Sequence, residues 1–305
     1  MQRAIGPVVV CALIMSIILM ARPVMAEGPL PVYVSILPQQ YFVKKVGGDM
    51  VDVSVMVPPG ANPHIYEPRP AQMVALSKAK IYFAVGVTFE ETWLPRFTAA
   101  NPKMRVVHTE DGIEKIPMLA HHNHDNGGKE GHGKTGPPRE ASSGIRDPHL
   151  WVSPPEVRIL ALNICSALQE FDPAGSLGYH ANYQAFLKEI DELDSELKRI
   201  FAGMEGMKFM VFHPAWGYLA RGYGLEQVPV ELEGKEPKPA QLKALIEHAR
   251  KEGIKVIFVQ PQFSTKSAQT IARAIGGQVV FADSLSPDWA GNLREQALKF
   301  QAALR

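Results

Sequence analysis

Short apolar, strand-like runs occur in two groups of four along the chain, and stretches with helical spacing of apolar residues lie between them. This alternation predicts βα units, with a parallel sheet in each half of the chain. The strand-like runs are Val32–Leu37, Val51–Val57, Ile81–Val85 and Arg105–His108, followed by Lys208–Phe212, Gln227–Glu231, Lys255–Val259 and Gln278–Ala282. We expect helices at Pro70–Lys78, Pro239–Glu252 and Ser264–Ile275, and a last helix, opened by Pro287, that runs toward Leu304.

One long helical pattern, about Leu177–Ala202, separates the two halves. Apolar residues recur along it at helical spacing, and charged residues fill most of the other face. A helix of this length extends about 39 Å and would form a rigid strut. We therefore predict an α/β fold with two βα lobes joined by one long rigid helix. The expected division is an N-terminal lobe at 27–172, a linking helix at 173–206 and a C-terminal lobe at 207–305.

The first 26 residues differ from the rest. Arg3 supplies a positive start, an uncharged run from Ala4 to Ala21 follows, and Val24–Ala26 offers small residues for a signal peptidase. This pattern predicts a cleaved secretory signal at 1–26 and a periplasmic or otherwise extracytoplasmic protein. An uncleaved membrane anchor is the alternative, because about 18 apolar residues just span a bilayer.

Composition narrows the function further. The chain has 305 residues, of which 46% are hydrophobic, and its 32 basic residues balance 31 acidic ones. A nucleic-acid partner would need a basic excess, so we expect none. Once the signal is removed, Cys165 is the remaining cysteine. It falls in an apolar helical pattern, and we interpret it as core filler.

A polar segment interrupts the first lobe at about 117–146. Its middle, His121–Ser143, is rich in Gly, Lys, Pro, Asn and His and has almost no apolar residues. Such a segment cannot bury enough surface to offset its ordering entropy, so we expect a mobile loop.

Four short segments carry the candidate chemistry. They are Pro58–Pro68, with the sequence Pro-Pro-Gly-Ala-Asn-Pro-His-Ile-Tyr-Glu-Pro, then Asp147–Trp151 (Asp-Pro-His-Leu-Trp), Phe212–Tyr218 (Phe-His-Pro-Ala-Trp-Gly-Tyr) and Phe281–Leu285 (Phe-Ala-Asp-Ser-Leu). Three of the segments follow predicted strands, and ligand sites in open α/β sheets lie beyond the carboxyl ends of strands. In three, a proline next to the histidine stiffens the backbone. The candidate ligands are His64, His149, His213 and Asp283.

The residues alone leave this site undecided. A single histidine beside an aromatic residue is more often structural than a ligand. The separations between the four candidates are also too long for a compact zinc motif.

Together the four segments and the long helix resemble one known family over nearly all of the mature chain. They are similar to the metal-specific solute-binding proteins of bacterial ABC importers, which carry zinc, manganese or iron. The resemblance implies that His64, His149, His213 and Asp283 bind one metal ion in the cleft between the lobes. It also implies an ABC transporter permease in the inner membrane as the partner, and we expect a monomer.

Three imidazoles and one carboxylate suit Zn²⁺, whereas Mn²⁺ prefers more oxygen ligands. We therefore expect Zn²⁺, with Mn²⁺, iron or another divalent transition metal as the alternative. Glu67 is a candidate for orienting an imidazole, or else a surface or capping carboxylate. Trp151 and Trp216 either line the cleft or pack in the core, and Tyr66 is similarly ambiguous.

Histidines outside the four segments have lesser roles. The loop residues His121, His122, His124 and His132 are candidates for auxiliary metal capture, unless the loop is a merely solvated linker. We interpret the other three, His108, His180 and His248, as structural or surface residues.

Two further function classes compete with metal binding for transport. A zinc hydrolase needs a site for water and a general base, and only Glu67 offers an obvious base near a candidate ligand. The chain also has neither a His-Glu-x-x-His nor a Gly-x-Ser-x-Gly motif, so we expect no enzyme. A surface adhesin or metal-storage protein would lack a transporter partner.

Overall fold

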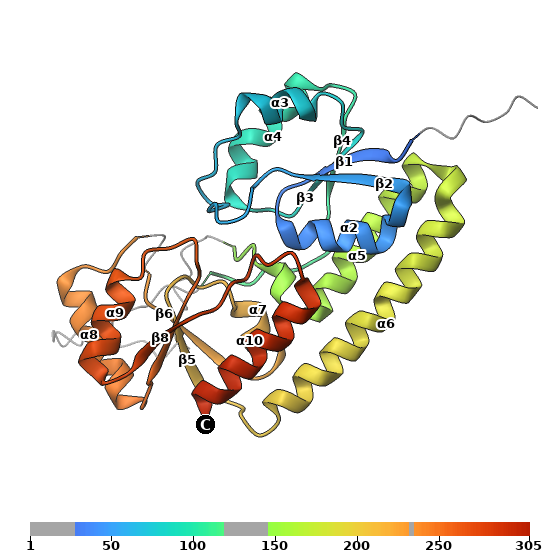
Figure 1. Cartoon of the computed structure of the whole chain (residues 1–305). Coiled ribbons are helices and arrows are strands. Elements are labelled where there is room, and N and C mark those ends of the chain that lie inside the picture. The colour runs from blue at the N-terminus through green and yellow to red at the C-terminus, as the bar shows by residue number, and fades with distance from the viewer. Residues whose placement is uncertain (1–27, 119–145, 232–234) are drawn as a thin grey trace, which may run out of the picture.

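Two α/β lobes face each other in the computed structural model, and one long helix runs alongside both (Figure 1). The structure describes residues 28–118, 146–231 and 235–305. The predicted signal at 1–26 and the loop histidines His121, His122, His124 and His132 lie outside these ranges. Within them, no helix combines the length and the apolar character that a membrane crossing needs.

Within residues 28–118, the N-terminal lobe contains a four-stranded parallel sheet in the order β2-β1-β3-β4. Its central strands place Val32 beside Ile81 and Val34 beside Phe83, and all four side chains are buried. Strands covered on both faces read as unbroken apolar runs. The elements are β1 (Leu30–Val34), α2 (Leu37–Gly47), η1 (Gly48–Met50), β2 (Val51–Val55), α3 (Pro70–Leu76), β3 (Ile81–Ala84), α4 (Thr88–Ala100) and β4 (Arg105–His108).

The described part of the C-terminal lobe repeats this topology, with a four-stranded parallel sheet in the order β6-β5-β7-β8. Met210 and Val211 of the central strand β5 lie beside Ile257 and Phe258 of β7. The elements are β5 (Lys208–Val211), α7 (Gly217–Gly222), β6 (Glu226–Pro229), α8 (Pro239–Lys251), β7 (Val256–Val259), α9 (Lys266–Ile275), β8 (Gln278–Phe281) and α10 (Trp289–Leu304). In such sheets the carboxyl ends of the central strands favour ligand sites.

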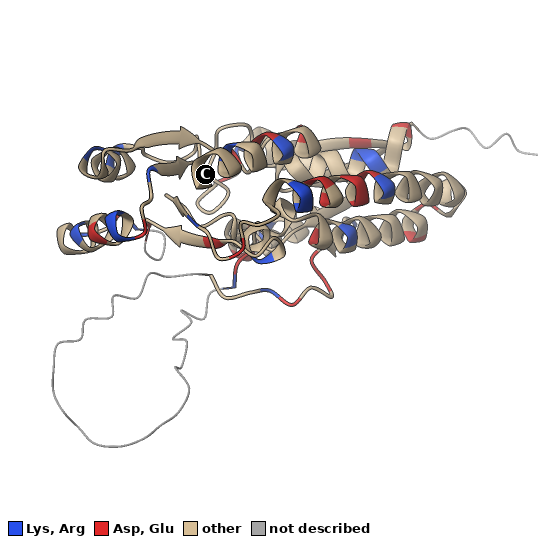
Figure 2. Ribbon diagram, turned by 90° about the horizontal axis from the view of Figure 1, so that it is seen from below, with Lys and Arg blue, Asp and Glu red and all other residues tan. Residues whose placement is uncertain are grey.

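A pair of helices, α5 (Pro154–Phe171) and α6 (Ser176–Phe201), lies beside the lobes, preceded by the short turns η2 (Leu150–Val152) and η3 (Pro173–Gly175). Helix α6 buries one face and contacts α5, α2 of the first lobe and α10 of the second. The buried face consists of Tyr179, Phe186, Ile190, Leu193, Leu197 and Phe201. Seen from below, basic and acidic positions are interspersed along the helices (Figure 2).

Polar contacts also tie α6 to both lobes. Glu189 forms an ion pair with Lys45 of α2 at 2.6 Å, and Glu196 forms one with Arg294 of α10 at the same distance. These pairs are partly exposed and contribute little free energy. Helix α6 is therefore held in place mainly by its buried apolar face. The structure confirms the predicted fold of two lobes joined by one long helix.

Several element boundaries differ from the sequence predictions by a few residues, and two of the differences have a clear physical cause. The run Val32–Leu37 is divided, because β1 ends at Val34 and Leu37 already begins α2, with a proline in its first turn. Pro287 does not open the last helix. Helix α10 begins at Trp289, and the Asp288 carboxylate accepts a hydrogen bond from Gly291 N at 3.1 Å. Cap chemistry, not proline, sets this boundary.

Candidate metal centre

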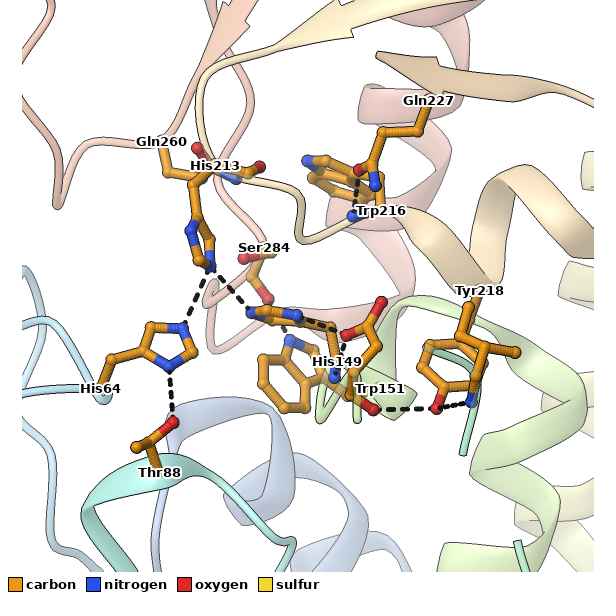
Figure 3. Close-up of polar contacts among 12 residues, drawn as sticks. His64, Thr88, His149, Trp151, His213, Trp216, Tyr218, Gln227, Gln260 and Ser284 are labelled. Carbon is orange, nitrogen blue, oxygen red and sulfur yellow. Dashed lines mark hydrogen bonds and ion pairs between the residues drawn. The ribbon is translucent and has the colours of Figure 1, made fainter. Parts of the chain in front are cut away.

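Three histidines from distant parts of the chain meet between the lobes (Figure 3). The Nε2 atom of His213 lies 3.1 Å from Nε2 of His64 and 3.2 Å from Nε2 of His149. His149 and His213 are buried, and His64 is partly buried. The three are the only group of His, Cys, Asp or Glu side chains in the described ranges whose ligand atoms converge closely enough to hold a metal ion.

Two of the histidines sit in the same kind of turn. The side-chain oxygen of Asn62 accepts a hydrogen bond from His64 N at 2.8 Å, and the Asp147 carboxylate accepts one from His149 N at 2.9 Å. Asn and Asp favour such turns because the side chain bonds the backbone two residues on. In both turns the middle residue is a proline, whose ring fixes its own backbone torsion. The sequence therefore places these two imidazoles rigidly.

His213 is placed by the sheet. It follows β5 at the carboxyl end, and its carbonyl accepts a hydrogen bond from Gln260 Nε2 at 2.9 Å, just beyond the adjacent strand β7. The Phe263 ring stacks on the imidazole, with 4.6 Å between centroids and an interplanar angle of 16°. The third ligand thus lies where the carboxyl ends of the two central strands meet.

The second nitrogen of each imidazole has a partner. Nδ1 of His149 lies 2.7 Å from Asp147, Nδ1 of His213 lies 3.2 Å from Glu231, and Nδ1 of His64 lies 3.1 Å from the Thr88 hydroxyl. An ionised carboxylate only accepts hydrogen bonds, so Nδ1 of His149 and of His213 carries the hydrogen. In a neutral ring, Nε2 is then a bare acceptor that points at the cluster.

Electrostatics favour a cation at this point. Nε2 of His149 and Nε2 of His213 are both acceptors, yet they lie 3.2 Å apart. Burial, and then the neighbouring His213 and His149, lower the pKa of His64 to about 2. Burial also lowers the pKa of His213, against the opposing effect of Glu231. The His64 and His213 rings are therefore neutral at neutral pH, and lone pairs that converge in this way favour a cation between them.

The spacing suits zinc. Zn–N bonds of about 2.0–2.1 Å in a tetrahedron give nitrogen separations of about 3.3–3.4 Å along its edges. The two observed Nε2 separations, 3.1 and 3.2 Å, fall slightly below that value. These two separations match two edges of a tetrahedron with imidazoles at three of its corners, and a fourth donor would complete it.

The structure does not bring Asp283 into the group of three histidines. Asp283 lies just beyond β8, where its Oδ1 accepts hydrogen bonds from Gln262 Nε2 at 3.1 Å and from Leu285 N at 2.9 Å. It lines a cavity of about 80 Å³ between the lobes, together with Gln262 and the loop before His64. Asp283 is thus near the cleft but engaged elsewhere.

Glu67 does not orient an imidazole in the structure. It is exposed, and the described residues give it no hydrogen bond or ion pair. Trp151 and Trp216 are fully buried core residues, although the Trp151 ring also contacts the His149 ring at 5.2 Å. Tyr66 donates a hydrogen bond to Gln72 at 2.7 Å.

Sequence reasoning missed the residues that do orient the imidazoles. Asp147 could have been found, because an Asp two residues before a candidate ligand is placed to bond both its backbone and its ring. Thr88 and Glu231 carry no such local signal. Each is contributed by a different element, and only the folded chain brings them to His64 and His213.

Comparison with known proteins agrees with this geometry. A sequence profile of the family described as "Zinc-uptake complex component A periplasmic" (ZnuA) matches residues 32–303. A crystal structure of ZnuA superposes with a TM-score of 0.81 at 40% sequence identity, covering 91% of this chain and 100% of that one.

Two curated relatives differ in the metal that their names record. The zinc-binding protein AdcA of Streptococcus pyogenes is 27% identical over 271 residues, which are 88% of this chain and 52% of AdcA, so the chain spans about half the length of that relative. The iron-binding protein YfeA of Yersinia pestis is 29% identical over 255 residues, which are 81% of this chain and 75% of YfeA. Since the family profile covers most of the chain, the protein belongs to the family of the periplasmic zinc-uptake component A.

Proposed function

We propose that this protein acts outside the cytoplasm, where it captures Zn²⁺ between its two lobes and delivers the ion to the permease of an ABC transporter. His64, His149 and His213 bind the ion through Nε2, and Asp283 is the fourth ligand. One observation carries the proposal: Nε2 of His213 lies within hydrogen-bonding distance of Nε2 of both His64 and His149, although Nε2 of His149 and of His213 are both bare acceptors. Two acceptors at this distance repel each other, and a cation bound between them removes the repulsion.

Ligand chemistry and family membership support zinc as the cargo. Imidazole nitrogen is a common ligand of Zn²⁺, and the description of the family names zinc uptake. Manganese or iron is the alternative, favoured by the relative named as iron-binding. Because Mn²⁺ prefers oxygen donors, a site with three imidazoles should bind it more weakly than Zn²⁺.

The proposal also includes the delivery of zinc to a permease, the export of the protein and a role for the loop histidines. The family is one of transport components described as periplasmic, which supports export of this chain and a permease partner. His121, His122, His124 and His132 would collect zinc weakly before it reaches the cleft. Deleting residues 121–132 should lower the number of zinc ions bound and leave one tight site.

Competition titration with a fluorescent zinc chelator tests the proposal. Substituting His213→Ala removes one ligand and should weaken zinc binding at least a hundredfold. The matched control is His180→Ala, because His180 is exposed on α6. Equal effects of the two substitutions would refute the assignment. Parallel titration with Mn²⁺ and Fe²⁺ decides the cargo, and tighter binding of either than of Zn²⁺ would favour the alternative.

The hydrolase alternative finds no support in the described part of the chain. Both carboxylates next to the cluster, Asp147 and Glu231, accept hydrogen bonds from imidazoles and are not free to take a proton from water. Zinc-dependent turnover of an ester or phosphoester by the purified protein would revive it.

A further inference from the structure

The carboxylate of Asp283 is restrained by one neighbouring side chain. Its Oδ1 accepts a hydrogen bond from Gln262 Nε2 at 3.1 Å and another from Leu285 N at 2.9 Å. Gln262 and Asp283 both line the interlobe cavity of about 80 Å³, next to Pro58–Ala61 of the opposite lobe. The loop Pro58–Ala61 leads to His64, so this pair lies beside the segment that carries one of the three histidines.

The backbone on both sides of Asp283 is fixed. Ala282 N donates to Val259 O at 3.0 Å, Asn292 Nδ2 donates to Asp283 O at 2.7 Å, and Trp151 Nε1 donates to Ser284 O at 2.7 Å. These bonds are largely buried, so they resist local movement. The carboxylate can therefore approach the histidines only by rotating about its own side-chain bonds, and Gln262 opposes that rotation.

Gln262 is itself placed by the loop that supports His213. The segment between β7 and α9 contributes Gln260, which donates to the His213 carbonyl, and Phe263, which stacks on the His213 ring. Phe263 N also closes a turn onto Gln260 O at 3.1 Å. Gln262 lies between these two contacts, so its amide has a defined position relative to the cluster.

We propose that Gln262 is a positioning residue that determines metal specificity by competing with the bound ion for the Asp283 carboxylate. This inference rests on the proposed function. Zn²⁺ held by three imidazoles can take a water in its fourth position when the carboxylate stays bound to Gln262, so the restraint costs it little. Mn²⁺ relies on oxygen donors and loses more when the nearest carboxylate is tied to an amide. Gln262 thus favours Zn²⁺ over Mn²⁺.

Substituting Gln262→Ala in the full chain tests the proposal. It removes a hydrogen bond to a charged group, and such bonds are worth enough to shift an equilibrium about tenfold. We expect the Kd for Mn²⁺ to fall about tenfold and the Kd for Zn²⁺ to change less than about threefold. The visible absorption spectrum of the Co²⁺-loaded protein should also change, since it reports the ligands of the ion.

The matched control is Gln269→Ala. It removes a similar amide bond, from Gln269 Nε2 to the Thr265 hydroxyl at 3.0 Å, on the adjoining helix α9 and away from Asp283. Neither metal preference nor the Co²⁺ spectrum should change in that variant. Gln262→Asn keeps the amide but shortens its reach, so it should reproduce the effect of Gln262→Ala if the alanine variant folds poorly.

Repeating the Gln262→Ala substitution in Asp283→Asn protein shows whether its effect depends on the Asp283 carboxylate. In Asp283→Asn protein, Gln262→Ala should leave the preference between Zn²⁺ and Mn²⁺ unchanged, because the competed carboxylate is gone. The same shift in both backgrounds, equal weakening of both metals, or no shift at all would overturn the role of Gln262. None of these results touches the proposed function, which is tested separately by the effect of His213→Ala on zinc binding.

Discussion

At the scale of single residues, the centre depends on what each imidazole does with its second nitrogen. Carboxylates contact Nδ1 of His149 and of His213, which leaves Nε2 of each ring to bind the metal. At His64, on the exposed side of the cluster, a hydroxyl contacts Nδ1 instead. Groups of this kind orient a ligand and raise its basicity. Zinc affinity should therefore respond to residues that never contact the ion.

Glu231→Gln tests this dependence. The amide preserves the shape of the side chain but removes the negative charge that fixes Nδ1–H of His213, so zinc affinity should fall about 10- to 100-fold. Competition titration measures the change. Glu247→Gln is the control, since Glu247 is exposed on α8 and forms only a 3.9 Å ion pair with Lys243. Unchanged affinity in Glu231→Gln would show that the contact does not support His213.

A glycine next to the cluster gives a second prediction. A Cβ at Gly217 would lie 2.7 Å from Asp147 Oδ2, so Gly217→Ala must displace the carboxylate that orients His149. We expect weaker zinc binding and a loss of about 1–3 kcal/mol in the free energy of unfolding. Gly222→Ala, at the other end of α7, meets nothing closer than 3.7 Å and should affect neither. Equal zinc affinity in both variants would contradict the role of Asp147.

The histidine pKa values predict how the metal-free protein responds to acid. The pKa of His64, lowered to about 2, and the lowered pKa of His213 both lie below the value of about 6.5 expected in the unfolded chain. The unfolded state therefore binds protons first as the pH falls below 6.5. The free energy of unfolding should be constant above that pH and then decrease by up to about 1.4 kcal/mol per histidine per pH unit.

Urea unfolding of metal-free protein between pH 7.5 and 5 measures this slope. His64→Gln should flatten it, whereas His180→Gln on the surface of α6 should not. A stability that rises as the pH falls through this range would reverse the sign and contradict neutral rings in the cluster.

At the scale of elements, the hydrophobic pattern predicted the strands and helices better than it predicted the side-chain contacts between them. Each of the eight strand-like runs overlaps a strand of the described structure, and the pattern Leu177–Ala202 corresponds to α6 within one residue. Such periodic segments carry their own signal. Helix α2 lies in one of the predicted helical stretches for which no bounds were given, and its first residue, Leu37, was assigned to the preceding strand-like run, although the proline in its first turn marks a helix start.

The candidate site was predictable to a different extent. The three histidines stand in segments with their own proline and turn signals, and the structure brings them together. Glu67 was a candidate for orienting an imidazole, with a surface or capping carboxylate as the alternative, and its side chain is exposed. The partners Thr88 and Glu231 depend on tertiary packing, which no local pattern encodes.

Helix α6 carries a prediction about stability. Ile190 is fully buried on the face that packs against the lobes, so Ile190→Ala should lower the free energy of unfolding by about 2–4 kcal/mol. Leu177→Ala on the same helix removes an 88% exposed side chain and should change it by less than about 0.5 kcal/mol. Urea unfolding compares the two. Similar losses would contradict a strut stabilised by one apolar face.

At the scale of the whole molecule, two repeated βα lobes bring the carboxyl ends of two sheets to one cleft. Direct hydrogen bonds across it, such as Trp151 Nε1 to Ser284 O at 2.7 Å and Trp289 Nε1 to Trp151 O at 2.6 Å, join the lobes beside the cluster. Together with α6 they limit how far the lobes can separate. The histidines are thus assembled by the fold itself, and little ordering entropy is lost when an ion binds.

The position of the bound ion tests the central claim most directly. Crystals of zinc-loaded protein, measured on both sides of the zinc absorption edge, locate the ion by its anomalous scattering. We predict one dominant peak about 2.0–2.1 Å from Nε2 of His64, His149 and His213. A dominant peak elsewhere, with these three nitrogens bound to no metal, would contradict the account.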